Sequence, residues 1–264
     1  MFHFGMPTML ELDGIEANVQ LCQAMGLEFV EINMNMPEYQ VEALDAEYLK
    51  ALMKEYEIYF TFHMADNLDI ANFQKEVRDV NVDLVRRTLE FAKAINSPSV
   101  NMHMQKGVLF TLPSGKVYIY DKYLDRYMTY VTEFGREMDT LLEGSHLKLV
   151  VENTGDFNLD FIQQSSQQLI NFKHIGMTYD IGHDFSSFGN DRDSILHNLA
   201  KITHMHLHDA EGEKDHLVLG QGQMQLERYI GFAKNFEIRC VIETKTVEAL
   251  RKSVEVLPKY LRQF

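Results

Sequence analysis

The chain has 264 residues, of which 45% are hydrophobic and 24% are charged, so collagen-like and disordered classes are excluded. A chain of this length buries enough surface to fold without disulfides or a structural metal. Its 25 Lys and Arg residues against 39 Asp and Glu residues give a net charge of −14. This acidic balance argues against nucleic acid or an anionic membrane as the main partner.

Three features of the sequence bear on the cellular compartment. Cys22 and Cys240 form no CxxC pair, and two cysteines cannot build a disulfide framework. The first Lys or Arg is Lys50, so the N-terminal region lacks the basic start of a secretory signal or transit peptide. No apolar run approaches the roughly 18–20 residues that span a bilayer. We therefore expect a cytoplasmic protein without a membrane segment. The sequence does not decide whether the protein forms a homo-oligomer.

Short, nearly continuous apolar runs recur along the chain and are typical of parallel strands buried on both faces. The eight predicted strands are Phe2–Met6, Glu28–Asn33, Ile58–Met64, Ser99–Met104, Leu147–Asn153, Ile175–Asp180, Ile202–Asp209 and Ile238–Lys245. Each is followed by apolar residues at helical spacing. These helical stripes cover residues 15–22, 49–56, 77–95, 124–141, 162–170, 195–199, 226–233 and 247–257, and Asp45 is a predicted N-cap.

Eight strands alternating with eight helices in about 250 residues predict an α/β fold, a (β/α)₈ TIM barrel, with one domain over residues 1–264. The rival architecture is a doubly wound open sheet. No GxGxxG or GxxxxGK[ST] motif follows any predicted strand, and the two glycines of LGQG (219–222) are a weaker signal that a turn explains. We therefore favour the barrel and expect no nucleotide cofactor.

Polar side chains gather at the carboxyl ends of the predicted strands, where barrels carry their functional residues. These strand-end residues are His63, His103, Glu152, Asp180, His183, His206, His208, Asp209, Asp215, His216 and Glu243. One such residue is common by chance, because the chain holds 11 His and 39 Asp and Glu. The full set is harder to explain without a shared function.

Three of these carboxylates, Glu152, Asp180 and Glu243, each follow an apolar run. Buried carboxylates require a counter-charge, and Lys245 is the only Lys or Arg near these strand ends. A divalent cation is the economical solution. Histidine and carboxylate ligands without cysteine suit zinc, manganese, iron or cobalt and do not separate them.

The order of these motifs along the chain resembles the xylose-isomerase-like barrel superfamily, which includes sugar and sugar-phosphate isomerases and epimerases as well as nucleases of the endonuclease IV type. The motifs are FTFHMADNLDIAN around His63, SVNMHM around His103, LVVENTG around Glu152, TYDIGH around Asp180, HMHLHDAEGEKDHLVLGQG from His204 and VIET around Glu243. They are specific jointly rather than singly, and they span essentially the whole chain.

The resemblance to the isomerase branch implies that Glu152, Asp180, His206 and Glu243 bind the metal. It further implies that Glu152 and Glu243 are the catalytic pair, which exchange a proton from opposite sides of a bound ketose through an enediolate. Such a base needs a pKa above that of a free glutamate. His183 would contact a substrate hydroxyl, and His63, His103 and Lys106 complete the predicted substrate-binding residues.

The alternative is a multi-zinc phosphodiesterase, an abasic-site nuclease of the endonuclease IV type. That resemblance implies additional ions held by His63, His103, His183, Asp215 and His216. The sequence departs from the nuclease pattern at the third ion, because the expected aspartate position is occupied by Lys214 and Asp215 is adjacent to His216.

The predicted strand-end loops favour a small sugar over nucleic acid. A nuclease offers Lys and Arg to phosphates, whereas Arg192 and Lys214 are the only basic residues in the loops NMNMPEYQ, ADNLDIAN, DFSSFGNDRD and DAEGEKDHLVLGQGQ. Lys106, Lys116 and Lys245 are the candidates to meet a phosphate. Residues 105–120 form either a lid or a small hairpin on the rim. A barrel that binds ligand without turnover is a third hypothesis, and the glutamate pair argues against it.

Overall fold

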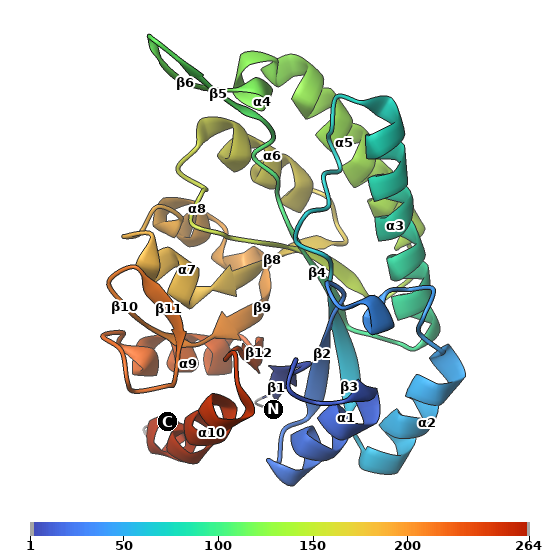
Figure 1. Ribbon diagram of the computed structural model, residues 1–264, viewed down its shortest axis with the longest axis vertical. Coiled ribbons are helices and arrows are strands. Elements are labelled where there is room, and N and C mark those ends of the chain that lie inside the picture. The colour runs from blue at the N-terminus through green and yellow to red at the C-terminus, as the bar shows by residue number, and fades with distance from the viewer. Residues whose placement is uncertain (1–2, 263–264) are drawn as a thin grey trace.

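Eight parallel strands close into a barrel in the computed structural model, which describes residues 3–262 (Figure 1). Around the barrel the order is β1-β12-β9-β8-β7-β4-β3-β2. The barrel strands are β1 (His3–Pro7), β2 (Phe29–Asn33), β3 (Tyr59–His63), β4 (Ser99–His103), β7 (Lys148–Glu152), β8 (Ile175–Asp180), β9 (Ile202–Leu207) and β12 (Arg239–Ile242). The predicted barrel is confirmed. Seven of the predicted strands contain one of these elements, and the first, Phe2–Met6, overlaps β1, which extends to Pro7, while Phe2 lies outside the described residues.

Helices surround the barrel and bury one apolar face each against it. They are α1 (Gly14–Ala24), α2 (Ala46–Tyr56), α3 (Lys75–Ala94), α4 (Ile119–Lys122), α5 (Leu124–Leu141), α6 (Asp160–Ile170), α7 (Ile181–Ser186), α8 (Arg192–His197), α9 (Leu226–Asn235) and α10 (Val247–Leu261), with 3₁₀ turns η1 (Pro37–Tyr39) and η2 (Leu199–Lys201). Asp45 caps α2 as predicted, because its Oδ1 accepts hydrogen bonds from the amides of Glu47 and Tyr48. None of the helices within residues 3–262 has the length and apolar character needed to cross a bilayer.

The strand ends differ from the predicted ranges in two places that matter for the site. The run predicted through Asp209 divides into β9 and a short strand β10 (Asp209–Glu211), which pairs with β11 (Lys214–Leu217). The run predicted through Lys245 leaves the ladder after Ile242, so Glu243 stands just beyond the barrel. Both changes place polar side chains at the open end of the barrel rather than within its sheet.

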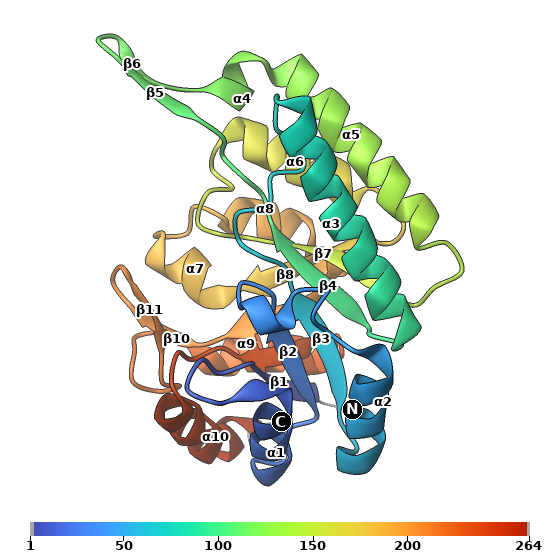
Figure 2. The same ribbon diagram turned by 45° about the vertical axis from the view of Figure 1, so that its right-hand side comes forward.

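Residues 105–120 contain an antiparallel hairpin, β5 (Leu109–Leu112) and β6 (Gly115–Tyr118). The hairpin projects away from the body of the molecule in both views (Figures 1 and 2). Every residue of β5 is exposed, and contact with the body begins near Tyr118, whose ring lies 5.4 Å from that of Phe161. The predicted hairpin therefore exists, but its strands extend into solvent instead of packing on the rim.

Candidate metal centre at the mouth of the barrel

Glu152, the last residue of β7, lies at the centre of the site and is 1% exposed. Its Oε2 is 3.2 Å from Nε2 of His63 and 3.2 Å from Nε2 of His103, which end β3 and β4. Its Oε1 lies 3.2 Å from Nδ1 of His206 and 3.5 Å from Nδ1 of His183. One carboxylate thus contacts four of the predicted site histidines.

Three of the four residues predicted to bind the metal, all carboxylates, converge on Nδ1 of the fourth, His206. Besides Glu152, this nitrogen lies 3.0 Å from Oε2 of Glu243 and 3.7 Å from Oδ2 of Asp180. Parallel strands bring these residues together, because Asp180 is paired in register with His206 and Glu243 follows the adjacent strand β12. The geometry of the predicted ligand set is therefore present.

A further group lies on the solvent side of this set. Nε2 of His183 is 3.9 Å from Oδ2 of Asp215, whose Oδ1 is 2.7 Å from Nδ1 of His216. Nε2 of His216 also reaches Oε1 of Glu243 at 3.3 Å. The spacing of Asp215 and His216 in the sequence departs from the nuclease pattern. In the structure, His216 adopts a left-handed backbone conformation with φ of 54°. The side chains of Asp215 and His216 both lie close to His183.

Several buried atoms at this site lack a hydrogen bond, as expected where a cation binds. Within the described residues, these include Nδ1 of His206, Nε2 of His103 and Oε2 of Glu243. Buried polar atoms are rarely left unsatisfied. A divalent cation bound by imidazole nitrogens and carboxylate oxygens would satisfy all three atoms, so the side chains fit such an ion.

Neighbouring carboxylates favour the protonated form of His63, His183 and His216 by raising their pKa values. Burial alone would lower the pKa of His63, but the hydrogen bond and charge of Glu152 raise it to about 9. Burial likewise opposes the charged form of His183, whereas Asp180 and Glu152 raise its pKa to about 10. Burial also opposes charge on His216, but Asp215 and Glu243 raise its pKa to about 9.

The same contacts correct two sequence-based expectations. Burial would raise the pKa of Glu152 and of Glu243, but His206 and its neighbouring histidines hold both well below the usual range. The sequence-based expectation of a raised glutamate pKa is therefore wrong for Glu152 and Glu243 as they stand in this structure. Histidines also supply the counter-charge assigned to a cation, so the argument for a metal rests instead on donor atoms that lie close together but form no hydrogen bond.

A second layer of side chains orients the predicted ligands; in it, sequence reasoning missed Asn101 and Thr178 and assigned no role to the strand-end residue His208. Asn101 donates a hydrogen bond to Oε2 of Glu152 and accepts one from the Thr178 hydroxyl at 2.7 Å. Nδ1 of His208 accepts the amide hydrogen of His216, so Nε2 carries the proton that bonds Asp180 at 3.0 Å. The detectable signal is a polar residue inside an apolar strand, as for Asn101 in SVNMH.

Glu31 is the most consequential residue that sequence reasoning missed. It lies in the middle of β2, is 2% exposed, and its Oε1 is 2.8 Å from Nε2 of His206. Its Oε2 is 2.8 Å from Nε2 of His204. A charged residue inside the apolar strand FVEIN was the available signal.

The lysines considered for a phosphate are already paired or distant. Lys106, a predicted substrate-binding residue, lies 2.8 Å from Asp156, and Lys245 lies 3.1 Å from Oε1 of Glu243. Lys116 is an exposed residue of the projecting hairpin. The structure therefore brings no lysine of this group into the site with a free charge, as judged over residues 3–262.

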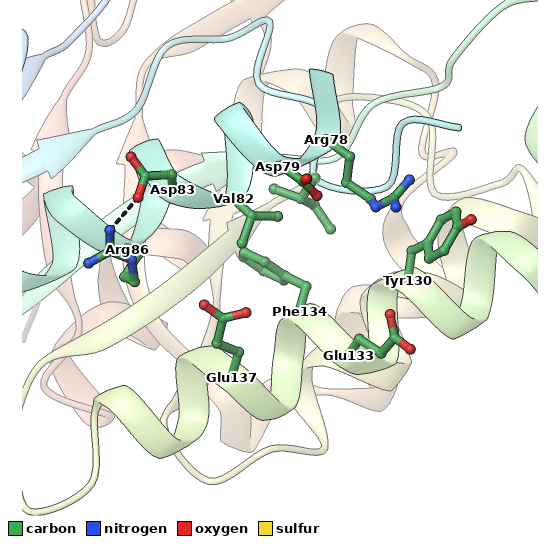
Figure 3. A pocket seen from close by; sticks show the side chains of 10 residues that line it. Arg78, Asp79, Val82, Asp83, Arg86, Tyr130, Glu133, Phe134 and Glu137 are labelled. Carbon is green, nitrogen blue, oxygen red and sulfur yellow. Dashed lines mark hydrogen bonds and ion pairs between the residues drawn. The ribbon is translucent and has the colours of Figure 1, made fainter. Parts of the chain in front are cut away.

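A groove of about 330 Å³ on the outer surface lies between α3 and α5 and includes none of the predicted site residues (Figure 3). Its charges pair locally, as Arg86 does with Asp83. The Arg78 guanidinium lies over the Tyr130 ring at 3.8 Å from the centroid. We assign this groove no function, and the strand-end cluster remains the candidate site.

Comparison with known families agrees with the barrel fold. A family model described as xylose isomerase-like TIM barrel matches residues 19–260. The chain belongs to the xylose isomerase-like TIM barrel family. An uncharacterized protein of Methanocaldococcus jannaschii is 24% identical over 216 residues, which cover 80% of this chain and 81% of the relative.

Solved structures of similar fold cover nearly the whole xylose isomerase-like barrel. A D-tagatose 3-epimerase-like protein superposes with a TM-score of 0.81 at 22% identity, covering 99% of this chain and 98% of the other. The 3-keto-D-glucoside 4-epimerase of E. coli superposes with a TM-score of 0.75 at 16% identity, covering 99% and 100%. At these identities the likeness establishes the fold.

Proposed function

We propose that this xylose isomerase-like barrel is a metal-dependent sugar or sugar-phosphate isomerase or epimerase. The observation that carries the proposal is the pair Glu152 and Glu243, both within 3.2 Å of Nδ1 of His206 at the mouth of the barrel. Named sugar epimerases among the structural neighbours support the same substrate class.

The proposed metal ligands are Glu152, Asp180, His206 and Glu243, and the chemistry of this donor set suits zinc, manganese, iron or cobalt. A bound divalent cation would stabilise negative charge that develops on substrate oxygens. His183 is 20% exposed and lies between the buried ligands and solvent, so it is the proposed contact for a substrate hydroxyl. His63, His103 and Lys106 remain proposed substrate contacts.

In the proposed reaction, Glu152 and Glu243 move the proton. One carboxylate removes the proton from the carbon beside the carbonyl to give an enediolate and then releases that proton to solvent. The other, once it has taken up a proton from solvent, delivers it to the opposite face of the enediolate. Both groups are ionised and can therefore accept a proton. Their imidazole contacts weaken them as bases, so productive binding requires substrate and cation to replace some of those contacts.

The test measures deuterium uptake from solvent into ketoses, with and without a phosphate group, by mass spectrometry with the metal-loaded enzyme. We expect Glu152→Gln and Glu243→Gln each to abolish turnover, a loss of at least about 10²–10⁴-fold, because an amide cannot accept the proton. His103→Ala should retain part of the activity. Full activity in either glutamine variant would rule out proton exchange between this pair.

The multi-zinc phosphodiesterase is the second candidate, and one observation favours it. Two further groups of possible ligands adjoin the proposed metal set. One consists of His63 and His103, which contact Glu152, and the other of His183, Asp215 and His216. Two or three zinc ions per chain by elemental mass spectrometry would support this candidate. About one ion per chain would support the isomerase.

A further inference from the structure

Glu31 contacts the proposed metal site from inside the barrel. Its side chain belongs to β2, whereas both imidazoles that it contacts belong to β9, and β1 and β12 lie between these strands in the barrel order. His204 and His206 are two residues apart on one strand, so both side chains point to the same face. The contact therefore crosses the barrel interior beneath Glu152 and Asp180.

The chemistry of these contacts determines where the imidazole protons lie. An ionised carboxylate only accepts hydrogen bonds, so Nε2 of His204 and Nε2 of His206 both carry a proton. The Thr61 hydroxyl donates a third hydrogen bond, at 3.1 Å from Oε2 of Glu31. Because its Nε2 is protonated, a neutral His206 has its lone pair on Nδ1, the atom that faces Glu152 and Glu243.

We propose that Glu31 is a positioning residue, which fixes the ring and the tautomer of His206 so that Nδ1 is presented as a metal ligand. This inference rests on the proposed function and assigns no contact between Glu31 and substrate. Ligand histidines generally depend on such a partner, whose loss costs about 10–100-fold in metal affinity. This role also gives a reason for a buried carboxylate at a position where an apolar residue would pack without desolvation cost.

The principal test is Glu31→Gln, which keeps the size of the side chain. The single amide oxygen of the new side chain can accept an imidazole hydrogen from one ring, and its NH₂ group must face the other ring, so one of the two histidines changes tautomer or moves. We expect zinc affinity, measured by competition with a chromophoric chelator, to fall by about 10–100-fold. Wild-type affinity in this variant would overturn the inference.

Two matched variants separate positioning from general damage to the buried cluster. Thr61→Val removes the third hydrogen bond but keeps the carboxylate, and His204→Gln keeps a donor to Glu31 while leaving His206 in place. We expect both to lower thermal stability and to keep zinc affinity within about threefold of wild type. If His204→Gln weakens zinc as strongly as Glu31→Gln, the effect is general and the proposal fails.

A spectroscopic readout tests the tautomer directly. In the zinc-loaded, ¹⁵N-labelled protein, long-range ¹H–¹⁵N spectra should show His206 with a slowly exchanging proton on Nε2 and a metal-bound Nδ1. Glu31→Gln should lose that protected proton. If Glu31→Gln does not fold, Glu31→Asp replaces it in the test, because it keeps the negative charge but places it one methylene further from His206. This variant should weaken zinc binding and expose the Nε2 proton of His206 to exchange. An unchanged Nε2 signal in the folded variant contradicts the proposal.

The outcomes distinguish this inference from the proposed function. A wild-type chain that takes up no divalent cation overturns the metal-dependent function and this inference with it. A wild-type chain that binds zinc, beside a Glu31→Gln variant of equal affinity, overturns only the role of Glu31.

Discussion

Protonated histidines compete with a cation for the same carboxylates at the barrel mouth. His63 and His216, with pKa values raised to about 9, and His183, with a pKa raised to about 10, hold their protons at neutral pH. Each raised value means that the folded state binds the proton more tightly than the unfolded chain, whose histidines titrate near 6.5. This stabilisation is fully present below pH 6.5 and is lost as the pH rises through 9 to 10.

The first prediction concerns the protein in a metal chelator. We expect its melting temperature to fall as the pH rises from about 7 to about 9.5, because the imidazolium groups lose their protons and leave carboxylates close together. The measurement is differential scanning calorimetry across that range. In saturating zinc the fall should be absent, since the cation replaces the protons. A chelated protein whose stability is flat over this range would contradict the pKa directions.

At the residue scale, the predicted site and the missed residues differ in their position along the strands. Residues such as Glu152 and Asp180 could be proposed because they end their strands after apolar runs. Glu31 and Asn101 lie within strands, where the sequence alone does not say which face of the barrel wall a side chain occupies. Their partners lie on other strands, so only the closed barrel shows what they contact.

Asp209 organises the turn at residues 220–224, which follows the hairpin β10–β11. It is fully buried, and its Oδ2 accepts hydrogen bonds from the amides of Gly220 and Gly222, each at 2.9 Å. Its Oδ1 accepts the amide hydrogens of Ala210 and Met224. The LGQG motif is therefore the turn that the sequence indicated, held by a carboxylate rather than by a nucleotide phosphate.

The second prediction tests the close approach at this turn. A Cβ atom on Gly222 would lie 2.4 Å from the Ala210 carbonyl oxygen and 2.4 Å from Oδ1 of Asp209. Gly222→Ala should therefore lower the free energy of unfolding by about 1–3 kcal/mol, as measured by urea denaturation. Gln221→Ala, at an exposed position of the same turn, should change it by less than about 0.5 kcal/mol. Equal stability of both variants would show that the backbone of the turn shifts to accommodate a Cβ atom at position 222 without cost.

At the element scale, strands that are buried in the structure could be predicted from the sequence, whereas exposed strands could not be placed. The barrel strands could be predicted because both faces are covered and their apolar runs are continuous. The hairpin β5–β6 could not be placed, since its exposed strands gain little from the body of the molecule and leave no periodic pattern. The division of the run ending at Asp209 follows from hydrogen bonds to residues 220–224, which lie beyond any local window.

At the scale of the whole molecule, charge separates the two candidate functions. The net charge is −14, and Lys106 and Lys245 at the mouth already pair with Asp156 and Glu243. Binding a polyanion releases counterions only where free Lys and Arg meet phosphates. A neutral sugar places no such demand on the surface.

The last prediction follows from that difference and uses the zinc-loaded chain with a labelled duplex that contains an abasic site. We expect no cleavage and, at about 0.15 M salt, no binding tighter than the non-specific range of about 10⁻⁴–10⁻⁶ M, measured by fluorescence anisotropy. Asp156→Asn frees Lys106 and is the matched control: one released cation should strengthen binding only slightly. Cleavage, or tight binding that weakens steeply with salt, would favour the phosphodiesterase. Bound zinc ions would then attract the phosphates strongly enough to outweigh the acidic residues of the strand-end loops.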